Sequence, residues 1–212
     1  MSRFLNKTVC CPACGQMTEV SILCGAFYPL PPDLDGDTHN PSSLNTVQVC
    51  RHCGYAADSL QEMPPENISE LLKSDAYQAV LNDPEIDSTN KNLRLAILAD
   101  EFSGNTKSAA RHCMMLVWHL RTIRADEAVV SLALNRAIEC LSVYLEENAD
   151  PETACVLIDC LRRAGDFEGA EETAQSLMPY VSDTQLAAVV KFERSLIAAH
   201  DSEAHSLSEV TA

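Results

Sequence analysis

Two short cysteine motifs stand out in the first third of the chain, Cys11-Pro-Ala-Cys14-Gly15 and Cys50-Arg-His-Cys53-Gly54. Two residues between the cysteines let one tight turn direct both sulfurs at the same ion, and the glycine that follows suits a backbone position with positive φ. Two such turns supply four thiolates, which is the closed tetrahedral ligand set of structural zinc. We therefore predict one structural zinc site, formed by Cys11, Cys14, Cys50 and Cys53.

The gap between the motifs exceeds the roughly 15–20 residues of compact zinc ribbons. Doubling a loop costs only about 0.6 kcal/mol of closure entropy, whereas zinc coordination returns on the order of 10 kcal/mol or more. A thioredoxin-like redox pair or unrelated buried cysteines are the alternatives. A redox pair is typically a single motif at a strand–helix junction, so the doubled motif favours zinc.

Four other possible ligands lie close to these motifs in the sequence, and we expect each to be a bystander: Cys10, Cys24, His39 and His52. Apolar residues on both sides of the motifs favour short strands there: Val9, Val20, Ile22, Leu23, Val47 and Val49. The segment between the motifs is rich in proline and aspartate. Its aspartates at 33, 35 and 37 resemble the start of a calcium loop, but Leu44 stands where that loop needs a bidentate glutamate. A solvated turn with side-chain-to-backbone hydrogen bonds is favoured.

Together these residues resemble a bacterial family catalogued as domain of unknown function 2225. The resemblance is carried by Cys-Pro-x-Cys-Gly, by the aspartate-rich stretch with Asn40-Pro41, and by Val49-Cys50-x-x-Cys53-Gly54-Tyr55-Ala56-Ala57. Members of that family pair this cysteine module with helices related to tetratricopeptide repeats. The resemblance thus implies a zinc module followed by repeat-like helices, but it brings no established activity.

The composition describes a folded, acidic protein. Hydrophobic residues make up 46% of the 212 positions, which is enough for a core, and 15 basic against 31 acidic residues give a net charge of −16. Such a charge disfavours non-specific binding to nucleic acids or anionic membranes. Residues 1–62 offer only Arg3, Lys7 and Arg51 as basic side chains, too few for a phosphate footprint.

The N-terminus has no apolar stretch typical of a signal peptide, and apolar runs such as Met114–Trp118 are far shorter than the roughly 20 residues that span a bilayer. We therefore expect a cytoplasmic protein. In that compartment the ten cysteines are better interpreted as metal ligands and buried thiols than as disulfides. The buried thiols would be Cys113, Cys140, Cys155 and Cys160.

After Pro64-Pro65 the apolar residues follow a helical period of 3.6. About seven helices are expected, near 66–82, 91–102, 107–123, 126–147, 151–164, 167–178 and 183–199. Asp150 before Pro151 predicts one helix start, and Ser182-x-x-Gln185 predicts a capping box for the last helix. His112 and His119 can share a helix face, but no carboxylate lies at metal-binding spacing, so we expect them to be ordinary polar or half-buried residues.

Residues 157–177 read as one helical repeat unit. Gly165 ends a helix, Asp166 caps the next, and Ala170 is small enough to let the two helices approach. This spacing resembles the tetratricopeptide pattern, although a generic helical hairpin has similar features.

The predicted fold is α+β and mostly α, with a zinc-ribbon-like module at 1–62, an antiparallel, repeat-like helical domain at 63–200 and a disordered tail at 201–212. The predicted function is a non-enzymatic, zinc-stabilised scaffold or adaptor that binds a protein partner through its helices. The sequence has no phosphate-binding Gly-rich loop, no Gly-x-Ser-x-Gly and no His-Glu-x-x-His. The alternatives are a thiol- or zinc-dependent enzyme that uses Cys10, Cys24 or His39, and a nucleic-acid-binding zinc module.

Overall fold

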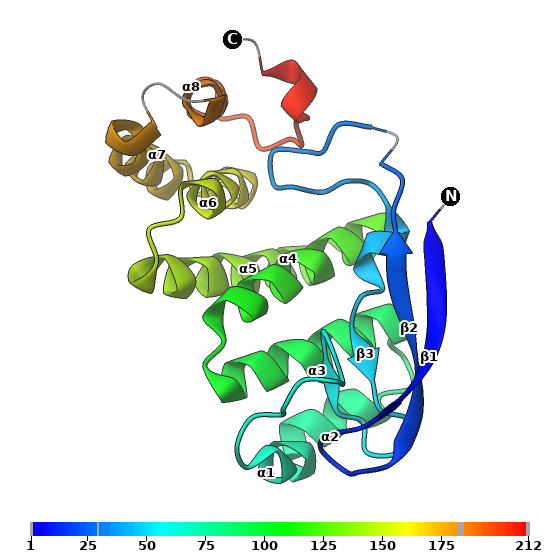
Figure 1. Ribbon diagram of the computed structural model, residues 1–212. Coiled ribbons are helices and arrows are strands. Elements are labelled where there is room, and N and C mark those ends of the chain that lie inside the picture. The colour runs from blue at the N-terminus through cyan, green and yellow to red at the C-terminus, as the bar shows by residue number, and fades with distance from the viewer. Residues whose placement is uncertain (1, 29, 182–184, 211–212) are drawn as a thin grey trace. The chain divides into compact units, whose positions relative to one another are not determined.

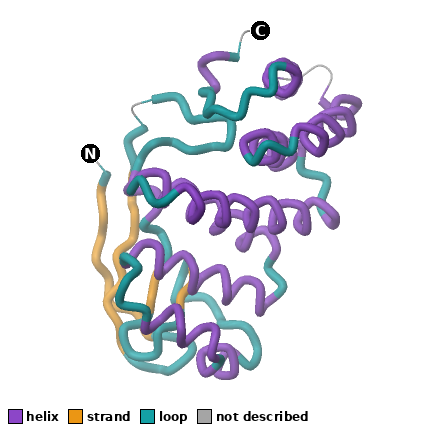
Figure 2. The backbone as a smooth tube through the Cα atoms, turned by 180° about the vertical axis from the view of Figure 1, so that it is seen from behind, coloured by secondary structure: helices purple, strands orange, loops and turns teal. Residues whose placement is uncertain are grey.

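The computed structural model describes residues 2–28, 30–181 and 185–210 (Figures 1 and 2). Over this part the chain forms eight α-helices and two small antiparallel sheets, so the fold is α+β and mostly α, as predicted. The chain divides into two compact units. The first consists of Met1–Phe27 and Asn40–Ala125, and the second of Tyr28–His39 and Asp126–Ala212.

Each cysteine motif of the first unit is the turn between two antiparallel strands. Strand β1 (Arg3–Cys10) pairs with β2 (Met17–Gly25), and β3 (Gln48–Val49) pairs with β4 (Ala56–Ala57). All four strands, orange in Figure 2, belong to this unit. The predicted short strands around the cysteines are therefore present, and β1 is longer than the apolar pattern indicated.

The helices of the first unit are α1 (Ile68–Lys73), α2 (Asp75–Asn82), α3 (Ser88–Ser103) and α4 (Thr106–Thr122). A single helix was expected at 66–82, but the structure has two. They separate at Ser74, whose backbone is extended and whose hydroxyl accepts a hydrogen bond from the backbone N–H of Tyr77. A serine in this position is a favourable N-cap, so it starts α2 instead of continuing α1.

The cysteine module and the helices of the first unit share one hydrophobic core. Cys11, Cys50 and Leu60 are almost completely buried in the same cluster as Tyr77 and Leu95. The predicted boundary at residues 62–63 falls inside this core and therefore differs from the division seen in the structure. The physical reason is size, because about 60 loop-rich residues bury too little apolar surface to form a core of their own.

The second unit contains α5 (Glu127–Glu147), α6 (Pro151–Arg163), α7 (Phe167–Val181) and α8 (Gln185–Ala198), each packed on the next. Asp150 caps α6 by accepting from the Thr153 N–H, as predicted. Gly165 has φ +83° just after α6, and the Asp166 side chain accepts from the Gly169 N–H at the start of α7. The capping box predicted at Ser182 lies outside the described residues. Whether these helices form true tetratricopeptide-like repeats stays a prediction.

Among the described helices, α5 is the one long and apolar enough, by length and composition, to cross a membrane. Core helices of soluble proteins meet the same criteria. Arg136 and Glu139 form a 2.6 Å ion pair near the middle of α5, while Leu134 and Leu141 lie on a buried face. Charged residues are costly at the centre of a bilayer, so these features are those of a core helix.

Residues 201–210 are ordered, contrary to the disordered tail that was predicted; residues 211–212 lie outside the described part. The Leu34 N–H donates to the His205 carbonyl, and the Leu207 N–H donates to the Pro32 carbonyl, both at 2.9 Å. Figure 1 shows the C-terminal segment in red beside the blue loop that contains residues 30–39. The fully buried Arg162 guanidinium also donates to the backbone carbonyls of residues 201 and 203. These partners are distant in sequence, so local composition could not reveal them.

Candidate metal centre

The two cysteine motifs adopt the same backbone turn. In the first, the Cys11 N–H donates to the Gln16 carbonyl and the Gly15 N–H donates to the Cys11 carbonyl, both at 2.8 Å. In the second, Cys50 and Gly54 make the equivalent bonds at 2.9 Å, with the Tyr55 carbonyl as the first acceptor. Both glycines have positive φ, +72° and +78°, which is the conformation predicted from their position after each second cysteine.

The four sulfurs converge on one point. The Cys11 and Cys53 Sγ atoms are 3.7 Å apart, the Cys14 and Cys50 Sγ atoms are also 3.7 Å apart, and all four lie within 4.8 Å of one another. Four sulfurs bound tetrahedrally at about 2.3 Å from an ion are about 3.8 Å apart, whereas a disulfide requires about 2.05 Å. The spacing therefore fits a shared metal ion such as zinc, and these cysteines are free thiols.

The electrostatics of the cluster favour a bound cation. Burial raises the pKa of Cys11 and of Cys53. Burial acts in the same direction on Cys50, but the backbone N–H groups of Cys53 and His52 and the neighbouring thiols outweigh it and lower the Cys50 pKa to about 7. Thiols must lose their protons to bind a metal ion. A cation at the centre would stabilise four crowded thiolates that burial otherwise disfavours.

The second motif is anchored to helix α2. The Tyr77 hydroxyl donates to the Gly54 carbonyl at 2.9 Å and accepts from the Ala56 N–H at 3.2 Å, and the Tyr77 side chain is completely buried. A Cβ added at Gly54 would lie 2.7 Å from Cδ2 of Leu81, whereas one added at Gly15 would meet no atom within 4 Å. The two motifs have the same turn, but the second is packed tightly and the first is open.

The other candidate ligands lie outside the four-sulfur group, as expected. Cys10 and Cys24 are exposed, and the His52 ring donates from Nε2 to the Met17 carbonyl at 3.0 Å. His39 belongs to the second unit, where its Nε2 is 3.0 Å from Oδ1 of Asp33. Asp33, Asp37 and His39 bring one ligand atom each within 4.8 Å of one another, an arrangement that can hold a cation but is common without one.

The aspartate loop forms the predicted side-chain-to-backbone turns, but it is not fully solvated. The Asp37 N–H donates to Asp35 Oδ1, and the His39 N–H donates to Asp37 Oδ1. Asp35 is only 1% exposed, and its Oδ2 accepts from the Arg163 guanidinium at 3.1 Å. The expectation of a solvated loop was therefore wrong for Asp35, because an arginine more than a hundred residues away supplies its partner.

The carboxylate partners and the near-complete burial of two histidines were not predicted from the sequence. His112 is 1% exposed and lies between Asp100, 2.6 Å from Nδ1, and Asp58, 3.1 Å from Nε2. His119 is also buried, with its Nε2 2.9 Å from a carboxylate oxygen of Asp87. The search for carboxylates at helical spacing missed these partners because all three come from other segments. The four cysteines predicted to be buried in the helices are buried: Cys113, Cys140, Cys155 and Cys160.

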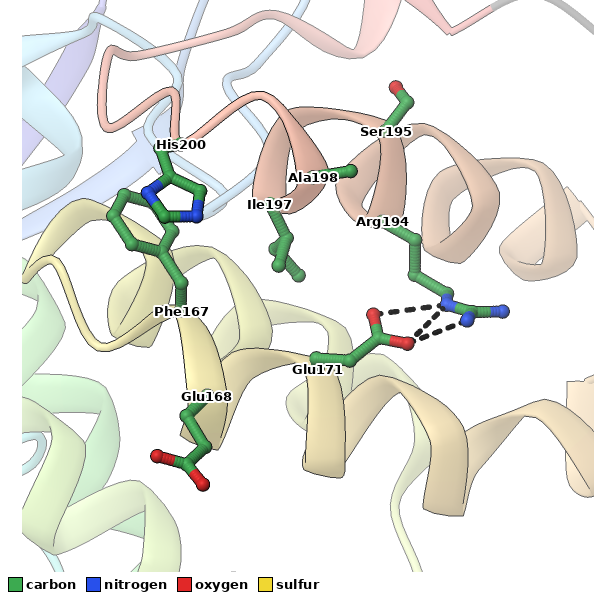
Figure 3. Close-up of a pocket in the computed structure, with 8 residues that line it drawn as sticks. All are labelled: Phe167, Glu168, Glu171, Arg194, Ser195, Ile197, Ala198 and His200. Carbon is green, nitrogen blue, oxygen red and sulfur yellow. Dashed lines mark hydrogen bonds and ion pairs between the residues drawn. The ribbon is translucent and has the colours of Figure 1, made fainter.

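An open groove of about 540 Å³ lies between α7 and α8 of the second unit (Figure 3). Phe167 and His200 stack at one end with ring centroids 4.7 Å apart, and Ile197 lies between them and the other end. There Arg194 donates to both carboxylate oxygens of Glu171 at 2.6–3.1 Å. The groove is thus lined by both apolar and charged side chains.

No family model matches this sequence, and no curated protein or solved structure matches it significantly. The conclusions about function below therefore rest on the residues and their geometry.

Proposed function

We propose that the four cysteines hold one structural zinc ion and that the chain is a non-enzymatic scaffold or adaptor protein, a member of the family it resembles, with tetratricopeptide-like helices. The observation that carries the zinc assignment is the 3.7 Å separation within two sulfur pairs, close to the edge of a zinc–thiolate tetrahedron. Four thiolates fill the coordination shell and leave no position for a substrate or water. Such an ion stabilises a fold and does not catalyse a reaction.

The charge distribution supports a protein partner with a basic surface. The ranges 28–39 and 126–212 contain five of the 15 basic and 20 of the 31 acidic residues, so the second unit has a formal charge of −15 and the first unit −1. An acidic surface speeds association with a basic partner and disfavours binding of acidic proteins. The same excess repels nucleic-acid backbones, so a protein is the class of macromolecule that this unit fits.

The zinc assignment is tested by metal analysis of purified protein. We expect about one zinc per chain, with a lower content after replacement of any cluster cysteine by serine. The matched controls are Cys10→Ser and Cys24→Ser, because both residues lie outside the cluster and should keep the full content. Full zinc retention in Cys50→Ser would contradict the assignment.

The adaptor role is tested by affinity capture from the source organism's lysate. A stoichiometric partner with a basic surface should bind, and its binding should weaken with salt and in the Glu168→Lys/Glu172→Lys variant, whose two exposed carboxylates lie one turn apart on α7. Glu70→Lys on the nearly neutral first unit is the control and should bind normally. An acidic partner, or capture that the α7 variant leaves unchanged, would contradict the proposal.

A further inference from the structure

The first unit contains a cavity of about 380 Å³ beside the second cysteine motif. This volume falls within the roughly 300–1,000 Å³ range of small-molecule sites. The segment after the motif forms one wall, and the end of α3 with the start of α4 forms the other. Alanines at 56, 57 and 99 and the ring of Tyr55 contribute apolar surface, and Met63, Pro64 and Pro65 add hydrocarbon.

Three carboxylates line the same cavity: Asp58, Glu62 and Asp100. His112, which is 99% buried, makes close contacts with Asp58 and Asp100, at 3.1 Å and 2.6 Å, so it holds both at fixed positions. The Arg111 guanidinium also binds the Asp58 carboxylate. These contacts come from a loop and two helices, so the acidic groups are part of a built site rather than a chance surface cluster.

The charges in the cavity do not balance. Even with His112 protonated, two positive groups face three carboxylates. In the described part of the chain, the Glu62 side chain is exposed and makes no hydrogen bond or ion pair of its own. The site therefore favours a positively charged ligand.

We propose that this cavity binds an organic cation with an alkyl stem, that is, an alkylguanidinium or alkylammonium group. The carboxylates pair with the cationic head, and the hydrocarbon of Met63, Pro64 and Pro65 covers the stem. A bare metal ion would leave that hydrocarbon without a partner. The group can come from a free amine or from a lysine or arginine side chain of another protein. This site is separate from the acidic second unit that is proposed to bind the protein partner, since all of its lining residues lie in the first unit.

The test is a calorimetric titration of the full, zinc-loaded chain with n-butylguanidinium and with n-butylurea, which has a similar shape but no charge. We expect saturable binding of the cation at least tenfold tighter than that of the urea. Glu62→Gln should weaken it several-fold without disturbing the contacts of His112. Glu70→Gln, an exposed carboxylate outside the cavity, should have no effect.

A second arm distinguishes the sources of the cation. It uses a short arginine peptide and the same peptide with citrulline in place of arginine. If the arginine peptide binds more tightly than n-butylguanidinium and citrulline abolishes binding, the natural ligand is a protein side chain. If the peptide binds more weakly, it is a free amine. Equal binding of n-butylguanidinium and n-butylurea, or cation binding that Glu62→Gln leaves unchanged, would overturn the proposal.

Discussion

The two glycines of the cysteine motifs should differ sharply in their tolerance of a methyl group. Gly15 and Gly54 occupy the same turn, with φ of +72° and +78°. Alanine at either position has to adopt a left-handed conformation, which costs about 1–2 kcal/mol. At Gly15 nothing else opposes the methyl group. At Gly54 the methyl group would lie 2.7 Å from Leu81 Cδ2, so Leu81 has to move.

Leu81 packs against the shared core, so its displacement should add about 1–3 kcal/mol of overpacking to the Gly54→Ala cost. We expect Gly54→Ala to lower the free energy of unfolding by about 2–5 kcal/mol and Gly15→Ala by about 1–2 kcal/mol. The assay is urea unfolding of the zinc-saturated, reduced protein, followed by far-ultraviolet circular dichroism. Zinc content measured in parallel should remain near one per chain in both variants.

A double-mutant cycle isolates the contact. Leu81→Ala removes the methyl groups that meet the new Cβ, so Gly54→Ala should cost less in that background, with a coupling energy on the order of 1 kcal/mol or more. Gly15→Ala should be additive with Leu81→Ala, because no side chain lies near its Cβ position. Equal destabilisation by the two alanines, or additivity at Gly54, would refute the idea that the second motif is packed on α2.

Ala170→Leu should lower the stability of the second unit by about 1–3 kcal/mol, because Ala170 is completely buried among the α6–α8 residues. The control is Ala128→Leu at an exposed position, and equal melting temperatures of the two variants would place Ala170 outside a close helix contact. A second prediction concerns Glu193, whose pKa is raised from 4.5 to about 7 by burial and by the Asp159 carboxylate, against the pull of Arg162. A carboxyl group with a raised folded-state pKa binds more protons folded than unfolded, so its contribution to stability falls as the pH rises from about 4.5 to about 7. Glu193→Gln should therefore become more stable relative to the wild type across that window, as measured by denaturation at several pH values, and a constant difference would show that Glu193 is ionised throughout.

The sequence predicted those features that depend on local spacing. Two residues between cysteines and a following glycine were enough to predict which four cysteines cluster, and Asp150 and Asp166 marked their helix starts because a cap bonds within three residues. Features that depend on distant partners were missed. In the sequence Asp35 resembles a surface aspartate, because its partner Arg163 is distant along the chain. The buried position of His112 likewise depends on hydrogen bonds to Asp58 and Asp100, which lie in other segments.

The domain boundary was missed for a related reason. Composition changes at Pro64-Pro65, and a boundary based on composition follows that change. The hydrophobic core does not end at this change in composition. Leu60 is completely buried together with Tyr77 and Leu95, because the cysteine module needs the apolar surface of these helical residues to form a core. The loop at 28–39 belongs to the second unit because its backbone forms hydrogen bonds with residues 205–207. Neither segment has a hydrophobic pattern from which this pairing could be predicted.

That loop connects the proposed metal site, through the chain, to both units. Cys14 and Cys50 are 36 positions apart, and the chain between them includes Tyr28–His39 of the second unit. A metal ion bound by both cysteines closes this loop, and the entropy of closing one of this length is roughly 3 kcal/mol. When the metal is removed, the loop regains that freedom, and its hydrogen bonds to the C-terminal segment should open more often. We expect a chelator under reducing conditions to speed hydrogen exchange at the Leu34 and Leu207 amides by about 10- to 100-fold, while the amides of α6 change little. Re-addition of zinc should restore protection. Unchanged exchange at Leu34 after verified metal removal would show that the loop is held by the second unit alone.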